Sequence, residues 1–198
     1  MKKKFNAKDV LIPTIALFLI ASVCTAILAF TNSITYAKIQ ENNEKTKNET
    51  RSAVFPDALS FSEDKTVSAD GEEIVYNEAY SGYGDVIGYV FTASDKGYGG
   101  TVTVMTGIDA DGNLSGVETI ELSETAGLGM NAKKASFRDQ FKEKTGPFIV
   151  SKDSQKNDGT FEEINALTGA TITSRAVTSA VNKTVAAYKA LTGGGNNG

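Results

Sequence analysis

Four hydroxyl side chains lie close together near the C-terminal end of the chain, around the pair Gly169–Ala170. They fall within seven residues and belong to Thr168, Thr171, Thr173 and Ser174. A helical pattern follows them, from about residue 174 to residue 191. The first backbone N–H groups of a helix have no partner inside the helix, and the helix dipole favours negative charge there. The segment is therefore a candidate seat for a phosphate group, and an ordinary Ser/Thr N-cap is the alternative.

A second candidate segment runs from Ser123 to Met130 and reads Ser-Glu-Thr-Ala-Gly-Leu-Gly-Met. Gly127 and Gly129 flank Leu128. Glycine lets a backbone approach a flat ligand closely, because it has no Cβ atom. A plain loop between a strand and a helix is the alternative.

The residue inventory excludes several classes of chemistry. The chain has no His, and its single Cys is Cys24. A Cys/His zinc site, a cysteine-ligated iron–sulfur cluster, a His-ligated haem and a His-based catalytic triad are therefore excluded, as is a disulfide within the chain. We expect no metal and no catalytic side chain. If this protein transfers electrons, it must use an organic cofactor.

The N-terminal part predicts a membrane anchor. Residues 10–30 form an uncharged, mostly apolar run of 21 residues, with Pro13 near its start. A membrane-spanning helix needs about 20 such residues. The lysines before the run predict a cytoplasmic N-terminus and an extracytoplasmic C-terminal domain, and they are Lys2, Lys3, Lys4 and Lys8. We thus expect a single pass through the cell membrane. A cleaved signal peptide is the alternative, although its apolar core is usually about 7–15 residues long.

The remaining chain is acidic. Four of the 20 Lys and Arg residues and one of the 24 Asp and Glu residues precede residue 31, which leaves 16 basic and 23 acidic residues. This balance argues against a nucleic-acid partner, because nucleic-acid binding requires basic patches.

The pattern of the C-terminal part predicts an α+β domain. Apolar alternation predicts strands at residues 74–76, 86–91, 101–105 and 117–122, with short turns between them that imply an antiparallel sheet. Phe137 and Phe141 predict a short helix that packs on the sheet, and residues 148–150 a short strand. We expect residues 151–160 to be a solvated loop. Val177, Val181, Val185, Ala186 and Tyr188 lie on or near one face of the last helix, as core residues do.

Both candidate segments resemble motifs of one family. Thr168-Gly169-Ala170-Thr171 resembles the flavinylation motif of covalent FMN-binding domains, Asp-x-x-Ser/Thr-Gly-Ala-Thr, with Asn165 at the Asp position. The segment from Glu124 to Gly129 resembles the Glu-Thr-Pro-Gly-Leu-Gly motif of the same domains, with Ala126 at the Pro position. The turn Gly97-Tyr98-Gly99-Gly100 and the strand after it match the family's order as well.

The whole chain resembles the G subunits of the Rnf electron-transport complex, which are related to the C subunit of the sodium-translocating NADH:quinone oxidoreductase. The compact length favours the Rnf family. This resemblance implies that a flavin transferase attaches FMN to Thr171 as a phosphoester. It also implies that the flavin relays electrons among neighbouring membrane subunits, between ferredoxin and NAD, in a translocase that exports Na⁺ or H⁺.

The resemblance also assigns residues to the cofactor. By position, Thr168, Gly169, Ala170 and Thr173 lie near the phosphate, and Thr173 donates a hydrogen bond to it. Those that border the ring are Glu124, Thr125, Gly127, Leu128 and Gly129. Glu124 is the expected polar contact of the ring or ribityl chain, and Leu128 the expected apolar contact.

The expected organisation has five parts. They are a cytoplasmic N-terminus at 1–9, a transmembrane helix at 10–31, a helical stalk at 32–55, an FMN-binding domain at 56–192 and a flexible tail at 193–198. Pro56 should end any helix near Val54. Two other functions stay open: a stand-alone extracytoplasmic flavoprotein electron carrier, and a flavin-free anchored binding module whose threonine segment is a plain helix cap.

Overall fold

The chain divides into two compact units, Met1–Lys47 and Asn48–Gly198. The computed structural model describes residues 7–193, with residues 7–9, 37 and 154–156 described by their backbone only. Lys2, Lys3 and Lys4, used above to orient the anchor, and residues 194–198 of the expected tail lie outside the described residues. Gly193, assigned above to that tail, is the last residue of helix α3 (Thr171–Gly193).

The first unit is helical. Helix α1 (Ala7–Val54) contains Pro13 and a window with a mean hydropathy of 2.5, none of which is buried within the described structure. The hydroxyls of Thr14, Thr25 and Thr31 each donate to the carbonyl four residues earlier. These bonds satisfy polar groups that an apolar surrounding would otherwise penalise. The helix is long and apolar enough to cross a membrane, and it ends at Val54, as expected from Pro56.

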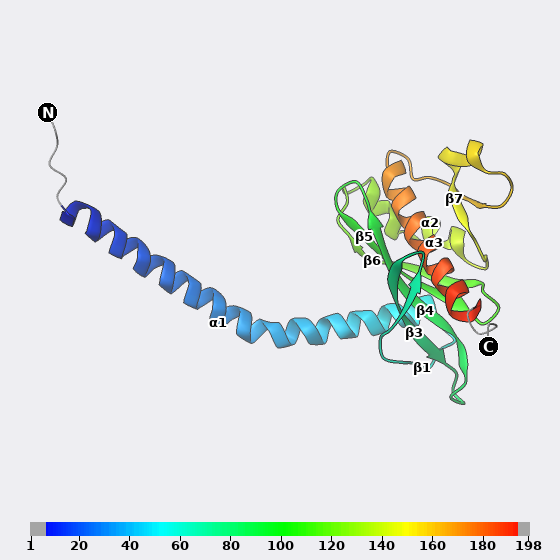
Figure 1. The fold of residues 1–198 in the computed structure, drawn as a ribbon, viewed down its shortest axis with the longest axis horizontal. Coiled ribbons are helices and arrows are strands. Elements are labelled where there is room, and N and C mark those ends of the chain that lie inside the picture. Colours follow the sequence, from blue (N-terminus) through cyan, green and yellow to red (C-terminus); the bar gives the residue numbers. More distant parts are fainter. Residues whose placement is uncertain (1–6, 194–198) are drawn as a thin grey trace. The chain divides into compact units, whose positions relative to one another are not determined.

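The second unit is built on an antiparallel sheet (Figure 1). The strands are β1 (Ser60–Phe61), β2 (Lys65–Ala69), β3 (Glu72–Tyr80), β4 (Val86–Lys96), β5 (Thr101–Asp109) and β6 (Leu114–Leu122). Their order is β1-β3-β4-β5-β6, and β2 also pairs with β3. The four strands expected from apolar alternation are confirmed as β3 to β6, each longer than its pattern indicated. The α+β fold class is confirmed.

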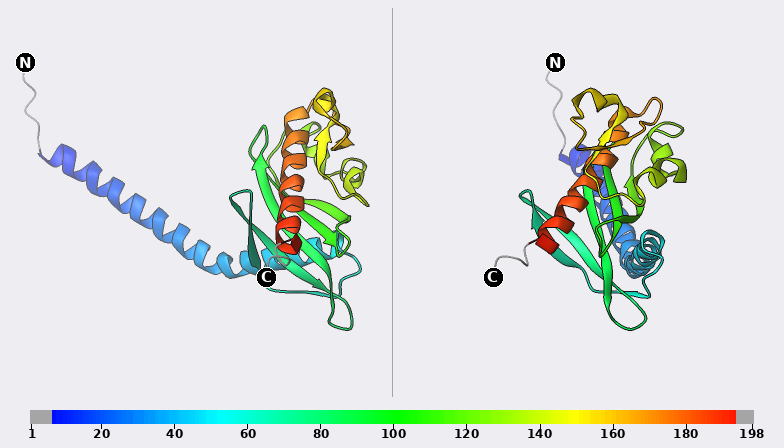
Figure 2. Two further views of the ribbon diagram at one scale, coloured as in Figure 1. Left: turned by 45° about the vertical axis from the view of Figure 1, so that its right-hand side comes forward. Right: turned by 90° about the vertical axis from the view of Figure 1, so that its right-hand side faces the viewer.

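Helix α3 covers one face of this sheet, which we call the α3 face (Figure 2). Alternate residues of β4 and β5 point into this core, including Phe91, Val102 and Val104. From the helix, Val177, Val181 and Val185 are buried, as expected. Ala187 is fully buried, whereas Ala186 is only partly buried. The α3 face is thus closed by apolar side chains of ordinary size.

The end of α1 covers part of the opposite face, which we call the α1 face. Val54 and Phe55 lie against glycines on three adjacent strands. A Cβ atom on Gly88 would come within 2.4 Å of the Phe55 ring, and one on Gly107 or Gly116 within 2.4 or 2.9 Å of Val54 backbone atoms. The backbone of α1 therefore reaches the sheet at positions where no side chain fits.

Arg51, 7% exposed, adds polar contacts to the α1 face. Its guanidinium donates to the side-chain oxygens of Asn48, Asn77 and Asp64, over 2.8, 3.1 and 2.6 Å. The amide of Asn77 in turn donates to Asp64 over 2.9 Å and to the Ser62 carbonyl over 3.0 Å. This Arg51 network joins the last turns of α1 to β3 and to the connection between β1 and β2.

The segment between β6 and α3 wraps around the end of the core. It comprises η1 (Gly129–Lys133), α2 (Ala135–Arg138), η2 (Asp139–Phe141), β7 (Phe148–Val150), η3 (Ser151–Lys156) and β8 (Glu162–Ile164). Phe137, Phe141 and Phe148 are buried in edge-to-face contact, which confirms the expected helical turn and the strand at β7. Two details differ from the sequence pattern. Residues 151–156 form a 3-10 helix rather than a loop, and β8 pairs with β7 in parallel.

Candidate functional site

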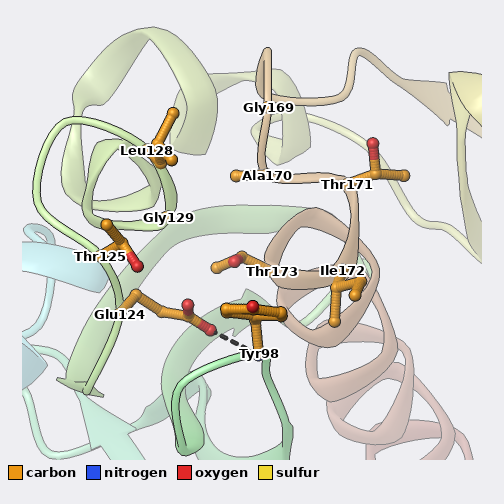
Figure 3. A pocket seen from close by; sticks show the side chains of 10 residues that line it. All are labelled: Tyr98, Glu124, Thr125, Leu128, Gly129, Gly169, Ala170, Thr171, Ile172 and Thr173. Carbon is orange, nitrogen blue, oxygen red and sulfur yellow. Dashed lines mark hydrogen bonds between the residues drawn. The ribbon is translucent and has the colours of Figure 1, made fainter.

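A pocket of about 600 Å³ lies where three connecting segments meet (Figure 3). One is the turn between β4 and β5, another is the loop after β6, and the third is the start of α3 with the residues before it. The pocket is lined by Tyr98, Glu124, Thr125, Leu128, Gly129, Gly169, Ala170, Thr171, Ile172 and Thr173. Both sequence motifs thus face one cavity.

Helix α3 begins at Thr171, three residues before the start that the helical pattern indicated. The backbone N–H of Ser174 makes the first helical hydrogen bond, to the Ala170 carbonyl over 3.0 Å. Within residues 7–193, the N–H groups of Thr171, Ile172 and Thr173 have no acceptor. Three such N–H groups at the start of a 23-residue helix are suited to bind an anion.

The alternative of an ordinary Ser/Thr N-cap does not describe this helix start. The residue before the helix is Ala170, whose side chain accepts no hydrogen bond. Ser174 Oγ accepts from the Leu167 N–H over 2.9 Å and donates to the Ala170 carbonyl over 3.0 Å. Ser174 is thus the only residue of the motif whose hydroxyl makes a hydrogen bond inside the described structure. This hydroxyl closes the loop before the helix and leaves the first-turn N–H groups free.

Thr173 is a buried polar side chain directed at the pocket (Figure 3). It is 1% exposed, and its hydroxyl makes no hydrogen bond to any residue that the structure describes. Its side chain lines the open pocket, where the hydroxyl can donate a hydrogen bond to an acceptor atom of a ligand.

Gly129 and Gly169 let the two loops approach the start of α3. A Cβ atom on Gly129 would lie 2.8 Å from Thr173 Oγ1 and 2.8 Å from Glu124 Cβ. Gly169 has a φ of +72°, in the left-handed region that favours glycine, and a Cβ there would lie 3.0 Å from Leu128. Gly129 was expected to let a flat ligand approach the backbone. In the structure, the side chains of Glu124 and Thr173 lie close to where a Cβ atom of residue 129 would be.

The carboxylate of Glu124 binds the turn between β4 and β5. Oε1 accepts from the Tyr98 N–H over 2.8 Å, and Oε2 accepts from the Gly99 N–H over 3.3 Å. The turn itself is closed by the Gly97 N–H and the Gly100 carbonyl over 2.8 Å. Glu124, expected to contact a cofactor directly, therefore also holds part of the pocket wall.

Most of the residues assigned from sequence to a cofactor lie together. Of the ten, only Thr168 and Gly127 do not line the pocket. Both are at exposed turns, and the φ of +78° at Gly127 shapes the loop that carries Leu128. Sequence reasoning assigned no role to Tyr98 or Ile172, although both line the pocket. The neighbouring residues could have indicated both positions. Tyr98 lies between glycines, and Ile172 lies between two threonines that had been assigned to the cofactor.

The charge of the pocket limits what it can bind. Glu124 is the only lining residue with a formal charge, and no Lys or Arg is among the ten. A phosphate would therefore be held by backbone N–H groups, hydroxyls and the helix dipole rather than by an ion pair. Tyr98, Leu128 and Ile172 supply an apolar part, and they are 73%, 44% and 49% exposed. The pocket fits a ligand with an anionic end and an apolar body.

Comparison with known proteins gives the family. Residues 97–186 match the FMN-binding domain, and residues 1–54 match the RnfG N-terminal region. The G subunit of the Na⁺-translocating ferredoxin:NAD⁺ oxidoreductase complex of Acetobacterium woodii is 40% identical over 190 residues, which cover 88% of this chain and 89% of that one. The G subunit of the proton-translocating ferredoxin:NAD⁺ oxidoreductase complex of Clostridium ljungdahlii is 41% identical over 108 residues, 54% of this chain and 57% of that one.

A solved structure is similar as well. The C subunit of the Na⁺-translocating NADH-quinone reductase from Parabacteroides distasonis aligns with a TM-score of 0.49 and 22% identity, over 67% of this chain and 75% of that one. The FMN-binding domain and the N-terminal match define the class of protein. The chain belongs to the family of G subunits of Rnf-type ion-translocating oxidoreductase complexes, which confirms the family expected from the motifs. The family and the apolar helix indicate association with a membrane.

Proposed function

We propose that this protein is a covalent flavoprotein subunit that relays electrons between ferredoxin and NAD within an Rnf complex. FMN is joined through its phosphate to Thr171 Oγ1, and its isoalloxazine ring lies in the pocket described above. The observation that carries this proposal is the start of α3. There the Thr171 hydroxyl and three N–H groups without an acceptor in residues 7–193 border the same cavity as the Thr173 side chain, which is 1% exposed.

Each of these groups has a task toward the phosphate. The free N–H groups of Thr171, Ile172 and Thr173 donate to phosphate oxygens, and the helix dipole stabilises their charge. The hydroxyl of Thr173 is held in place by its burial and donates a further bond. Because no Lys or Arg lines the pocket, these dipolar groups replace a cation.

Attachment requires a flavin transferase and a flavin dinucleotide. A bond forms between Thr171 Oγ1 and the FMN phosphorus, while the phosphoanhydride bond of the dinucleotide breaks. The displaced nucleotide phosphate leaves with the electron pair, and the hydroxyl proton passes to solvent. The added mass is that of FMN minus water. Once bound, the flavin supplies the redox chemistry that the side chains of this His-free chain lack.

The same proposal includes the placement of the chain. Residues 10–31 span the cell membrane once, the N-terminus is cytoplasmic, and the FMN-binding domain is extracytoplasmic, next to other membrane subunits of the complex. The apolar helix and the lysines before it support this orientation. A covalent bond would prevent loss of a cofactor held outside the cytoplasm. Of the two relatives, one is named for Na⁺ and the other for protons, so the exported ion is Na⁺ or H⁺.

The test is an intact mass and in-gel flavin fluorescence of the full chain, co-expressed with a flavin transferase. We expect a mass gain of one FMN minus water that is lost in Thr171→Ala. Thr66→Ala is the matched control, because Thr66 is an exposed threonine on β2 that belongs to neither motif and does not line the pocket, and it should keep the adduct. An unmodified wild-type chain, in cells where a known substrate is labelled, would favour the flavin-free binding module instead.

A further inference from the structure

The turn between β4 and β5 presents one side chain to the pocket. Tyr98 lies between Gly97 and the pair Gly99–Gly100, so its ring is the only side chain at the tip. In Figure 3 the ring lies between the Glu124 side chain and Ile172, below Thr173. It lines the pocket, yet 73% of it is exposed. A large aromatic ring that is mostly exposed at the wall of a cavity is suited to contact a flat ligand.

The position of this ring is set by tight contacts beneath it. A Cβ atom on Gly97 would lie 2.3 Å from Glu124 Oε1, and one on Gly99 would lie 2.3 Å from the Ser123 carbonyl. The turn therefore rests directly on the backbone of Ser123 and on the Glu124 carboxylate. Together with the bonds from the Tyr98 and Gly99 N–H groups, these contacts make Glu124 the main polar support of the turn.

A second tyrosine, Tyr83, is exposed as well but does not line the pocket. Tyr83 lies between Gly82 and Gly84 at the tip of the β3–β4 hairpin and is 96% exposed. No pocket residue belongs to that hairpin, and no carboxylate within residues 7–193 binds the N–H of Tyr83, which donates to Ser81 Oγ over 3.2 Å. The two Gly-Tyr-Gly tips differ in support and in surroundings, so one serves as the control for the other.

We propose that Tyr98 packs against the isoalloxazine ring and that Glu124 is a positioning residue that acts through Tyr98. This inference rests on the proposed function, because it assigns the contacts of the same flavin. The phosphate is fixed at one side of the cavity by Thr171, and the apolar side chains that remain for the ring are Tyr98, Leu128 and Ile172. Of these, only Tyr98 is aromatic, and a phenol in contact with a flavin quenches its fluorescence by electron donation to the excited ring.

The experiment measures the fluorescence of the attached flavin, per absorbance at the flavin band, in the flavinylated full chain. Tyr98→Leu should raise this brightness, because the aromatic contact is lost while much of the apolar area is kept. Tyr98→Trp should keep the emission low. Tyr83→Leu should leave the brightness unchanged.

Variants of Glu124 test the positioning role. Glu124→Ala removes both bonds to the turn and should raise the brightness toward the level of Tyr98→Leu. Glu124→Gln keeps one acceptor oxygen and should lie between wild type and Glu124→Ala. In the Tyr98→Leu background neither change should raise the brightness further, because a residue that acts through Tyr98 has no effect once Tyr98 is absent.

The binding of free FMN gives a second readout. In the Thr171→Ala chain, Tyr98→Leu should raise the Kd for added FMN by about 2- to 12-fold, which corresponds to the free energy that an aromatic pair contributes. Tyr83→Leu in the same background should not change it.

The outcomes separate this inference from the proposed function. A wild-type chain without a flavin adduct would overturn the proposed function. A flavinylated chain whose brightness is the same in wild type and Tyr98→Leu would overturn the role of Tyr98 alone. A rise in brightness caused by Glu124→Ala on top of Tyr98→Leu would show a direct contact of Glu124 with the flavin and overturn its role as a positioning residue.

Discussion

The two faces of the main sheet are covered in different ways. On the α3 face, apolar side chains from β4, β5 and α3 interlock, with Phe137, Phe141 and Phe148 at one end. On the α1 face, the backbone near Val54 lies directly on Gly107 and Gly116, and polar side chains around Arg51 complete the contact. The α3 face is held by the large apolar area that its side chains bury. The α1 face combines a smaller apolar cluster, around Phe55, Val90 and Met105, with close backbone approach and hydrogen bonds.

This difference predicts how each face responds to substitution. An apolar core loses free energy in proportion to the volume removed, because the cavity is only partly refilled. A surface of glycines instead fails when atoms are added, because the backbone above cannot move away cheaply. The α3 face also positions the pocket, whereas the α1 face fixes the end of the N-terminal helix. Changes on the α1 face should therefore lower stability without removing the groups that line the pocket.

The largest effect should come from the α3 face. Phe141→Ala removes a fully buried ring that contacts Phe137 and Phe148, so it should lower the free energy of unfolding by about 3–5 kcal/mol. The measurement is urea unfolding of the full chain in detergent, followed by the near-ultraviolet circular dichroism of the tyrosines. Phe161→Ala is the control, because Phe161 is 37% exposed and should cost much less. Equal losses for the two would contradict the account of this face.

Next in size is the loss of the Arg51 network. Arg51→Met keeps most of the volume but leaves Asn77 Oδ1 without its donor, and it should cost about 2 kcal/mol in the same unfolding experiment. The control is Arg175→Met, which breaks an exposed bidentate pair with Asp153 and should cost about 1 kcal/mol or less. If Arg51→Met were neutral, the polar part of the α1 face would contribute nothing to its stability.

A third change, of similar size, adds atoms to the α1 face. Gly107→Ala places a Cβ within 2.4 Å of the Val54 carbonyl oxygen and of Ser115 Oγ, and it should cost about 1–3 kcal/mol. Gly193→Ala is the control, since a Cβ there meets no atom within 4 Å. Both variants should still accept the flavin adduct. A Gly107→Ala chain that is as stable as wild type would show that the end of α1 is free to shift.

The smallest effect concerns pH. Hydrogen bonds from Lys65 and Tyr80, over 2.7 and 2.5 Å, hold the pKa of Glu78 below its ordinary value of 4.5. A carboxyl whose pKa is lower in the folded state stabilises the fold above the pKa of the unfolded state. That contribution is lost as the pH falls below 4.5 and through the folded value.

The check is the urea midpoint at two pH values, one above 4.5 and one well below it. Glu78→Gln should reduce the fall in stability between the two pH values, by a small amount, because the two side chains are partly exposed to solvent, at 44% for Lys65 and 22% for Glu78. A wild-type chain and a Glu78→Gln chain that lose the same stability on acidification would refute this assignment.

Local patterns in the sequence predicted much of the fold. The alternation in β3 to β6 follows from one buried and one less buried side of each strand, and it needs no knowledge of the partners. Pro56 marked the end of α1, since the residue before a proline disfavours the helix. The two motifs identified eight of the ten residues that line the pocket, because loop residues that bind a ligand are close in sequence within each loop.

Other features depended on contacts between distant residues. The start of α3 at Thr171 depends on a loop closed by Ser174 and Leu167, and periodicity could not locate it because Thr171 and Thr173 carry no apolar signal. Strand β8 is three residues long and pairs with β7, so too few positions exist for a pattern. Arg51 reads as one more charge on a polar helix, although it is buried.

The sequence by itself determined the family, the apolar helix and the order of the strands along the chain. All of these depend on residue types at fixed spacing, which can be read directly from the amino-acid sequence. Only the tertiary structure decided that Tyr98 joins the pocket, that Glu124 supports the turn that carries it, and that Thr173 lies almost fully buried at the pocket wall. The reason is physical: the exposure and hydrogen bonding of a side chain depend on which distant segments lie beside it, and folding alone brings those segments together.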